Sequence, residues 1–401
     1  MRQWFYILSI AALFCASSIA QQLGEPTLGE MARKIRSDKQ ASDEAAPKPD
    51  DPKVLEEPKP APAAKPMSAK PPAQPTPAVE TNISSLNPQL LEEDELAYVA
   101  KVQELVSDDK FKELDKMADA ARASKARFKG GNWQLFVFYD AVTNPVGEHV
   151  SVADWNDLID RLKVWQRTMP ESVTANVALA QAYINLGWQA RGDGYADTVG
   201  ENGWKGLHES VEQAKEALRA AKELKDKCPQ QYVVAQHVAL IEGWDKEKTS
   251  ALFDEAVAFE PTYYYYYRNQ ANYLQERWHG DPGEAVQFAI VAASRVKGKQ
   301  GAYIYFEIAS VLNCHCEIEE DLPKMSWRLI KEGYAAMDEM YGTSLLKKNR
   351  FAYMAYRQND RGAAQKTLAQ VSANWNASVW GARRTFETAQ KWAFAEEQAG
   401  K

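Results

Sequence analysis

Cysteine is scarce in this chain, and its distribution excludes a scaffold built on disulfides. The 401 residues contain four cysteines, and three remain once a leading segment with Cys15 is set aside, an odd number that cannot pair completely. Cys314, His315 and Cys316 resemble a metal cluster, but residues two apart on a helix point about 200° apart and no second pair follows at zinc spacing. We expect buried apolar cysteines and predict neither a metal nor a cofactor.

Aromatic residues are absent from a long stretch near the N-terminus. Four of the 43 lie in the first twenty positions, none falls between Gln21 and Ala97, and the other 39 follow. Eleven of the thirty-one residues from 47 to 77 are proline. Such a segment buries too little apolar surface to offset its chain entropy, so we predict a disordered Pro/Ala/Lys-rich linker over 21–87. It is either an inert spacer or a tether that holds the folded domain away from a membrane.

The chain also lacks a surplus of positive charge. Its net charge is -7 and its sequence pI is near 5.5. Nucleic-acid binding depends on a concentrated Lys/Arg face that contacts phosphates, so this composition argues against a nucleic-acid partner. A protein or peptide is the partner that we predict instead.

One long hydrophobic run occurs, at the N-terminus. Arg2 precedes an apolar run, Trp4–Ala16, and Ser18 and Ala20 place small residues before a cleavage point. This layout predicts a signal peptide over 1–20 and an exported protein, periplasmic or extracellular. Because the run is at the short end of what spans a bilayer, the alternative is an uncleaved anchor that tethers the protein to the membrane.

The remainder, 88–398, shows helical apolar spacing with proline between the segments, so we predict an all-α domain. Asn87–Pro88, Ser151 with Asp154, and Asp281–Pro282 resemble helix starts. The expected helices span 88–107, 110–127, 133–143, 151–168, 172–191, 204–226, 230–243, 246–259, 262–278, 282–297, 301–318, 322–341, 343–358, 361–372 and 378–398.

One pair of expected helices is similar to a tetratricopeptide repeat. Phe253, Ala256 and Pro261 stand at the spacing of its large residue, small residue and terminal proline, after Val233 and Leu240 in the first helix. Other pairs of expected helices also alternate small and large apolar residues, but at a different spacing. The resemblance implies a tetratricopeptide-like solenoid of antiparallel helix pairs.

Three further stretches resemble a bacterial domain-of-unknown-function family, number four thousand and thirty-four. They are Gly131–Tyr139, Gln189–Thr198 followed by Trp204, and Pro261–Phe288. The resemblance would cover most of residues 96 to 300. It implies helical repeats and carries no catalytic assignment.

Five consecutive tyrosines, Tyr263–Tyr267, are the most unusual local feature. At about 100° per residue they sweep more than a helical turn and cannot all face one core stripe. Either neighbouring helices bury them on several sides, or some of them form an aromatic floor for a peptide or glycan. The candidate ligand-binding residues are Tyr263, Tyr264, Tyr267, Arg268, Trp278, Trp188 and Trp204.

A glycine-rich insertion, 187–206, holds six of the 21 glycines. The dinucleotide fingerprint fails there at its third glycine, and Asp193, Asp197 and Glu201 do not have calcium-loop spacing. The insertion either packs Tyr195 and Trp204 over a helix end or gates one end of a groove.

Catalytic motifs are not evident, since the five histidines are scattered and no serine has a nucleophile-elbow setting. His237, mid-helix among apolar residues, is expected in the core. The first hypothesis is therefore a non-enzymatic, exported helical-repeat scaffold that binds a protein or peptide in the cell envelope. The alternative is an α/α-toroid glycan-active enzyme with paired carboxylates, in which the first and last helices would meet. Trp380, Phe386, Trp392 and Phe394 suggest a terminal cap and favour the solenoid.

Overall fold

The computed structural model describes residues 31–35, 37, 91–147, 150–192, 198–312 and 321–395. The chain divides into two units, Met1–Lys70 and Pro71–Lys401. In the first unit, the six described residues are helical. The predicted signal peptide and the rest of the predicted linker lie outside the described residues, as do Cys314, His315 and Cys316.

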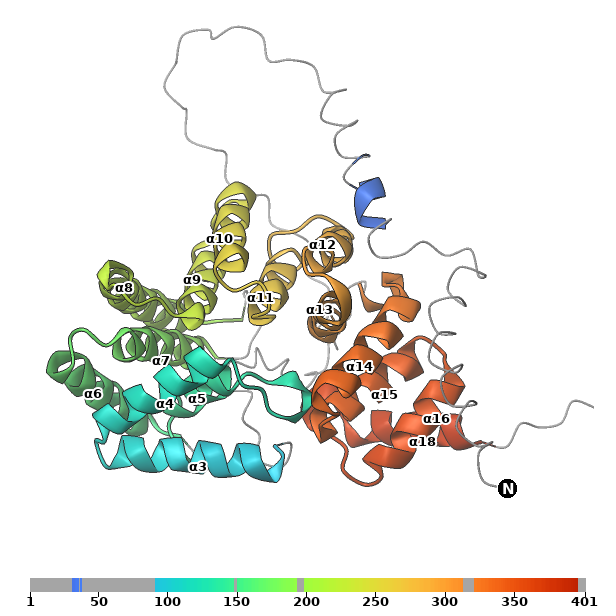
Figure 1. Ribbon diagram of the computed structural model, residues 1–401, viewed down its shortest axis with the longest axis horizontal. Coiled ribbons are helices and arrows are strands. Elements are labelled where there is room, and N and C mark those ends of the chain that lie inside the picture. Colours follow the sequence, from blue (N-terminus) through green and yellow to red (C-terminus); the bar gives the residue numbers. More distant parts are fainter. Residues whose placement is uncertain are drawn as a thin grey trace, which may run out of the picture. The chain divides into compact units, whose positions relative to one another are not determined.

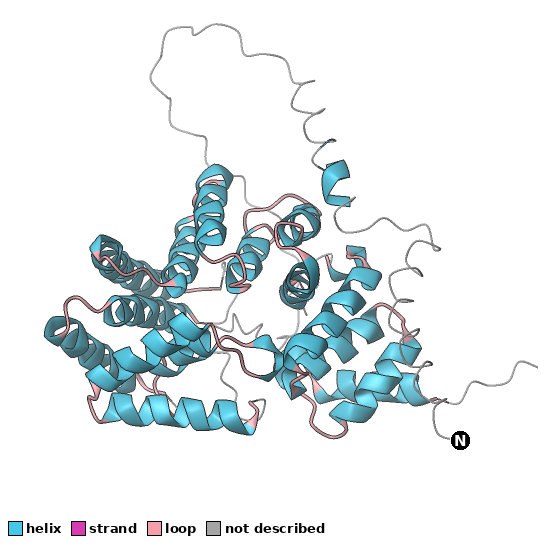
Figure 2. Ribbon diagram, viewed as in Figure 1, coloured by secondary structure: helices cyan, strands magenta, loops and turns pink. Residues whose placement is uncertain are grey.

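The second unit is built from helices (Figures 1 and 2). Its described residues contain no strand, and the one isolated bridge pairs Arg127 with Trp133. The all-α prediction is confirmed. The elements are α3 (Glu93–Ser107), α4 (Phe111–Ser124), η3 (Lys129–Gly131), α5 (Gln134–Val142), α6 (Val152–Thr168), α7 (Val173–Arg191), α8 (Glu201–Glu223), α9 (Pro229–Glu242), α10 (Lys246–Phe259), α11 (Tyr265–Tyr273), α12 (Glu284–Ala293), α13 (Gly298–Val311), η4 (Leu322–Lys324), α14 (Trp327–Tyr341), α15 (Leu345–Arg357), α16 (Arg361–Val371), α17 (Ala377–Trp380) and α18 (Arg383–Phe394).

Side-chain caps fix several helix starts. At α6, the Ser151 hydroxyl accepts a hydrogen bond from the Asp154 amide at 3.3 Å, and the Asp154 carboxylate accepts one from the Ser151 amide at 2.7 Å. This is the capping box that the sequence predicts. The predicted start at Pro282 is two residues early, because Gly283 has φ +77 and α12 begins only at Glu284.

Consecutive helices pack as antiparallel pairs, most extensively α7 with α8, α13 with α14 and α15 with α16. A small residue permits close approach in α14. A Cβ added at Gly333 would lie 2.3 Å from the carbonyl oxygen of Ala302 in α13. The repeat expected at α9 and α10 is present: these helices contact one another, Val233, Phe253 and Ala256 are buried, and the Phe253 ring packs on Tyr267 and Phe288 of the next pair. The second unit is thus a tetratricopeptide-like array of helix pairs.

The first helices of successive pairs also contact one another, α9 with α11 and α11 with α13. They form the inner layer of the array. A histidine in this layer, His237, is held neutral because burial lowers its pKa to about 4. By accessible surface His237 is only partly buried, so it lies at the edge of the core rather than within it as expected.

An early segment meets late helices at a junction that we call the seam, formed by η3, Glu92, Gly342 and Leu345 (Figure 1). The Gly130 amide donates to the Gly342 carbonyl at 3.0 Å, and the Leu345 amide donates to the Glu92 carboxylate at 3.1 Å. Residues more than two hundred positions apart are therefore joined by direct hydrogen bonds.

The array ends in a small core formed by α15 to α18. Trp380 and Phe386 are buried there, and the Trp392 ring packs on that of Tyr356 at 5.4 Å. The single helix expected over 378–398 is divided in two, because Gly381 adopts φ +68 between α17 and α18. Phe394 is exposed and does not belong to the buried face that the sequence predicts.

Candidate functional site

The five consecutive tyrosines are all buried, with exposed fractions between 0% and 6%. Helix α11 is short and is packed against α9, α10, α12 and α13, so rings on every side of it meet protein. Tyr263 contacts the Trp133 ring at 4.7 Å, and Tyr265 stacks on Phe136 at 3.6 Å. The core alternative is the one that the structure supports, and Tyr263, Tyr264 and Tyr267 do not form an exposed aromatic floor.

Each tyrosine hydroxyl has a hydrogen-bond partner inside the protein. The acceptors for Tyr263, Tyr264, Tyr266 and Tyr267 are Gln230 Oε1 (2.7 Å), Asn132 Oδ1 (3.1 Å), the Pro229 carbonyl (3.1 Å) and the Pro261 carbonyl (2.8 Å). The fifth hydroxyl, that of Tyr265, is hydrogen-bonded to the Tyr264 hydroxyl at 2.9 Å. Burial raises the pKa of all five phenols above the usual value. These groups are neutral hydrogen-bonding members of the core.

Arg268, a candidate binding residue on the same helix, belongs to a cluster of charges. We call Arg268, Glu307, Lys347 and Arg350 the charge cluster; they come from α11, α13 and α15. The Lys347 ammonium pairs with Glu307 Oε1, while Arg268 Nη1 and Arg350 Nη1 lie 3.5 and 3.9 Å from Glu307 Oε2. The side chains of Glu307 and Lys347 are 0% exposed, so this carboxylate and ammonium are fully enclosed.

Opposing effects set the ionisation of the enclosed pair. Burial favours the neutral form of Glu307, but Lys347, Arg268 and Arg350 outweigh it and lower the pKa of this carboxyl. Burial and the two guanidinium groups lower the pKa of Lys347, whereas Glu307 opposes them. The cluster contains three basic groups and one acid, and Glu307 is its ionised centre.

A second buried carboxyl, Glu95 of α3, lies near the seam. It accepts a hydrogen bond from Asn132 Nδ2 at 3.0 Å, and Asn132 Oδ1 accepts from Tyr264. Burial raises the pKa of Glu95 to about 7, against the lowering effects of Asn132 and Lys347. A hydrogen-bonded chain therefore connects the tyrosine run to an acid that titrates near neutral pH.

The three candidate tryptophans form a separate group, the tryptophan cluster. The rings of Trp188 and Trp278 are 6.2 Å apart and nearly perpendicular. Arg191, the last residue of α7, has its guanidinium carbon 5.5 Å from the Trp188 ring and 5.1 Å from that of Trp204. Trp188 is buried and the other two are partly exposed. Trp204 thus packs at a helix end, which is one of the two roles predicted for the insertion; residues 193–197 lie outside the described residues.

A third feature, which no sequence pattern predicts, is a groove of about 540 Å³ between η3, α14, α15 and α16. We call it the lysine groove. Its basic residues are Lys129, Lys331, Lys348 and Lys366, and Asp338 is its one acidic residue. Lysines spread over more than two hundred positions leave no local signal, because only the seam and the helix packing bring them together.

The walls of the lysine groove combine stacked rings with free charge. The Tyr334 and Phe351 rings stack at 3.9 Å with an angle of 10° between their planes. Lys129 pairs with Glu92 at 3.1 Å and Lys331 with Asp360 at 3.2 Å. Lys348 and Lys366 have no ion-pair partner among the described residues. Two ammonium groups of the groove are therefore available to a ligand.

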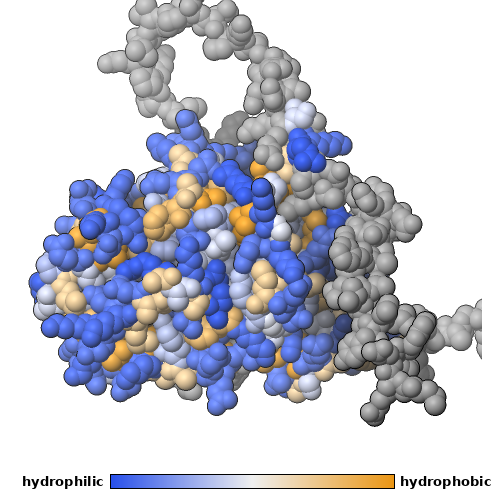
Figure 3. Space-filling model, in the orientation of Figure 1, coloured by the Kyte–Doolittle hydropathy of each residue, from blue (hydrophilic) through white to orange (hydrophobic). Residues whose placement is uncertain are grey.

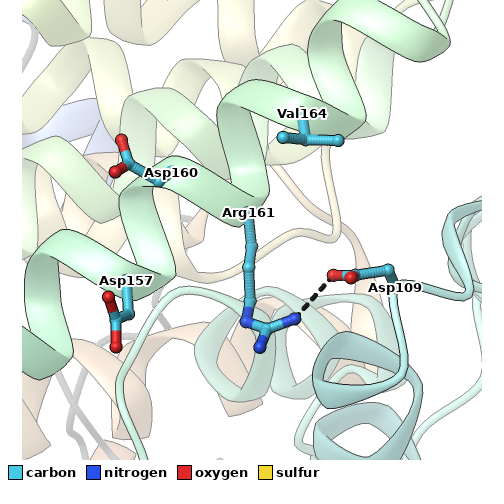
Figure 4. Close-up of a pocket in the computed structure, with 5 residues that line it drawn as sticks. All are labelled: Asp109, Asp157, Asp160, Arg161 and Val164. Carbon is cyan, nitrogen blue, oxygen red and sulfur yellow. Dashed lines mark hydrogen bonds and ion pairs between the residues drawn. The ribbon is translucent and has the colours of Figure 1, made fainter.

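A further hollow, of about 320 Å³, lies between α6 and the turn after α3 (Figure 4). Arg161 extends from α6 toward that turn and donates to Asp109 Oδ1 at 2.7 Å and to the Ser107 carbonyl at 3.2 Å. Asp157 and Asp160 lie along the same helix. These contacts tie two helix pairs together, so the role of this hollow is structural.

The fold and these sites define an all-α helical-repeat protein without an evident catalytic centre in its described residues. The chain is similar to a family described as a domain of unknown function, DUF4034, over residues 98–241. The predicted resemblance is confirmed for this range, α3 to α9, while the tyrosine-rich block 261–288 lies beyond it. No curated protein and no solved structure matches the chain. Among the described helices, none has the length and apolar character needed to cross a membrane.

Proposed function

We propose that the helical domain is a non-enzymatic scaffold that binds a protein or peptide partner, and that the lysine groove receives an acidic segment of it. The groove is the observation that carries the proposal. In a chain of net charge -7, it gathers four lysines and one aspartate. Glu92 and Asp360 neutralise two of these lysines, so the local positive charge rests on Lys348 and Lys366. It attracts a partner of opposite charge and disfavours a basic one.

The groove chemistry supports a mixed ligand, acidic with an aromatic or aliphatic side chain. The partly exposed Tyr334 ring offers an apolar surface and is backed by the buried Phe351 ring, and Lys348 and Lys366 stand beside it without ion-pair partners among the described residues. The face drawn in Figure 3 is mainly hydrophilic with scattered hydrophobic residues. Apolar surface combined with free ammonium groups favours a peptide segment over a simple salt ion.

The test uses a fluorescein-labelled peptide rich in glutamate with a central phenylalanine, and fluorescence anisotropy as the readout. The double variant Lys348→Glu, Lys366→Glu should weaken binding by at least about tenfold, because two attractive charges become repulsive. The matched control is Lys112→Glu, Lys116→Glu on α4, which makes the same change of net charge at two exposed positions. The control should stay within about twofold of the unaltered protein.

Salt provides a second criterion. Binding carried by exposed ammonium groups should weaken as ionic strength rises, since the Debye length falls to about 3 Å at 1 M salt. Equal loss of affinity in both double variants, or binding that is insensitive to salt, would contradict the groove as the binding site.

We also propose that the protein is exported, to the periplasm or beyond the cell. The support is the sequence pattern of 1–20, a short basic start, an apolar run and small residues before the cleavage point. Mass spectrometry of the mature protein tests it: an N-terminus at Gln21 is the expected result, and an intact Met1 would indicate the uncleaved, membrane-tethered form.

Two observations favour the alternative, a glycan-active enzyme. The seam joins an early segment to late helices, as a toroid would, and the pKa values of two buried acids are shifted in opposite directions. Glu95 and Glu307 have pKa values moved in opposite directions, by burial for Glu95 and by basic neighbours for Glu307, which is the pattern of an acid and base pair. Their exposed fractions of 1% and 0% leave no access for a sugar, so the scaffold remains our proposal. The test is release of nitrophenol from aryl glycosides. Activity in the unaltered protein that is abolished in both Glu95→Gln and Glu307→Gln would favour the enzyme over the scaffold.

A further inference from the structure

The charge cluster contains more positive charge than its single acid balances. Arg268, Lys347 and Arg350 converge on Glu307, which leaves two positive charges in excess when Lys347 is protonated and one when it is neutral; the pKa of Lys347 is lowered to about 7. The described residues place no other acid in an ion pair with these three basic side chains. Excess charge of one sign inside a protein is unfavourable unless a counter-ion is present.

Two of the three basic groups keep unused hydrogen-bond donors. The Lys347 ammonium is committed to Glu307 and lies 5.4 Å from the Tyr264 ring. The two guanidinium groups approach the same carboxylate oxygen at 3.5 and 3.9 Å, so neither makes the paired bonds that arginine forms with a carboxylate. Arg350 Nη1 is buried and has no hydrogen-bond partner among the described residues.

The cluster also retains a path to solvent. The side chains of Arg268 and Arg350 are 22% and 18% exposed, in contrast to the fully enclosed Glu307 and Lys347. Burial and the nearby Arg268 lower the pKa of Arg350, which reflects repulsion between the two guanidinium groups. An anion that contacts both groups would remove this repulsion.

We infer that the charge cluster binds a small divalent oxyanion of the phosphate type, which bridges the guanidinium groups of Arg268 and Arg350. Two negative charges match the excess of the cluster when Lys347 is protonated, and the oxygens of the anion accept the unused N–H donors. This site is distinct from the lysine groove, because Lys347 and Arg350 project from a different face of α15 than Lys348 and Phe351.

The direct test is isothermal titration of the full protein with sodium phosphate, with sodium chloride at equal ionic strength as the blank. Sodium sulfate and glycerol phosphate are the other arms, which separate a free ion from a phosphate ester. We expect saturable binding of phosphate and a rise in melting temperature with its concentration. Heat and melting curves identical to those in chloride would overturn the inference.

Variants locate the site. Arg268→Gln and Arg350→Gln should each weaken phosphate binding by at least about tenfold, since each removes a charged donor pair. The matched control is Arg295→Gln, whose guanidinium pairs with Asp254 at a partly exposed position and should leave phosphate affinity unchanged. Equal loss in the control and the cluster variants would contradict the assignment.

Glu307→Gln adds a readout that a purely structural role for the cluster would not produce. Loss of this carboxylate releases both guanidinium groups, while Lys347 becomes neutral because Glu307 is the group that raises its pKa. The two guanidinium groups then have no competing carboxylate, so phosphate should bind several-fold more tightly. Unchanged or weaker binding by a folded Glu307→Gln protein would overturn the inference. Should the arginine variants fail to fold, this variant and the titration of the unaltered protein still decide it.

Discussion

Glu95 predicts how the stability of the domain depends on pH. Its carboxyl group is 1% exposed, and burial raises its pKa from 4.5 to about 7 in the folded chain. Between these two values the folded state holds a proton that the unfolded state has released. Since stability rises with pH only where the unfolded state binds more protons, this group makes stability fall as pH rises from 4.5 to about 7.

The size of the effect follows from the pKa difference. A gap of about 2.5 between unfolded and folded values, at about 1.36 kcal/mol for each pKa unit, is on the order of 3 kcal/mol. This penalty is absent well below 4.5 and complete above about 7. Glu95→Gln keeps an oxygen that accepts the hydrogen bond from Asn132, and it cannot ionise. Its free energy of unfolding should therefore lack this pH-dependent loss.

The assay is chemical denaturation followed by tryptophan fluorescence at several pH values between about 5 and 8. The free energy of unfolding of Glu95→Gln minus that of the unaltered protein should grow by roughly 2 to 3 kcal/mol across this range. Glu93→Gln, an exposed neighbour on α3, is the matched control and should show a difference below about 0.5 kcal/mol at every pH. Parallel curves for Glu95→Gln and the unaltered protein would refute the reasoning.

Two further predictions concern packing. Gly333→Ala should destabilise the domain by about 1 to 3 kcal/mol, because the new methyl group would lie 2.3 Å from the Ala302 carbonyl; a normal melting temperature would contradict the close contact of α13 and α14. Tyr264→Ala and Tyr267→Ala should each remove about 3 to 5 kcal/mol of stability by opening a cavity in the core, as measured by circular dichroism during denaturation. Unchanged stability together with loss of peptide binding would instead indicate that the Tyr264 and Tyr267 rings contact the ligand.

The helices were largely predictable because their signals are local. Apolar spacing and capping residues are read within one or two turns, and α6 begins with the capping box that its sequence indicates. Errors occur where a single backbone angle ends a helix. Gly283 and Gly381 take positive φ values, which delays α12 and divides the last predicted helix. The sequence around Gly283 or Gly381 does not distinguish either glycine from one that lies inside a helix with ordinary helical angles.

The candidate site was predictable only in part. Trp188, Trp204 and Trp278 are predicted ligand-binding residues. Trp188 contacts Trp278, and Arg191 lies over Trp188 and Trp204, but nothing in the sequence indicates these contacts. The tyrosine run had to face several directions, and whether these were solvent or neighbouring helices depended on how many helices surround α11. The spacing of apolar residues predicts which faces of one helix are apolar, but it does not predict how many other helices pack against those faces.

The ion pair between Glu307 and Lys347 could not be predicted from the sequence for a related reason. Glu307 and Lys347 are forty positions apart on different helices, and each alone has the appearance of a surface residue. Burying either without the other would be strongly unfavourable, so the pair is enclosed together or not at all. Such mutual dependence is visible only after the helices are packed.

The seam bears on how far the family resemblance reaches. The matched range, 98–241, contains Lys129, whereas Lys331, Lys348 and Lys366 lie beyond it. The matched helices alone therefore supply one of the four lysines and neither ring of the stack. Because the Gly130–Gly342 hydrogen bond fixes η3 against the later helices, the groove is a property of the whole helical domain. A protein that shares only the matched range with this chain would lack the groove, so a function assigned to the groove does not transfer to it.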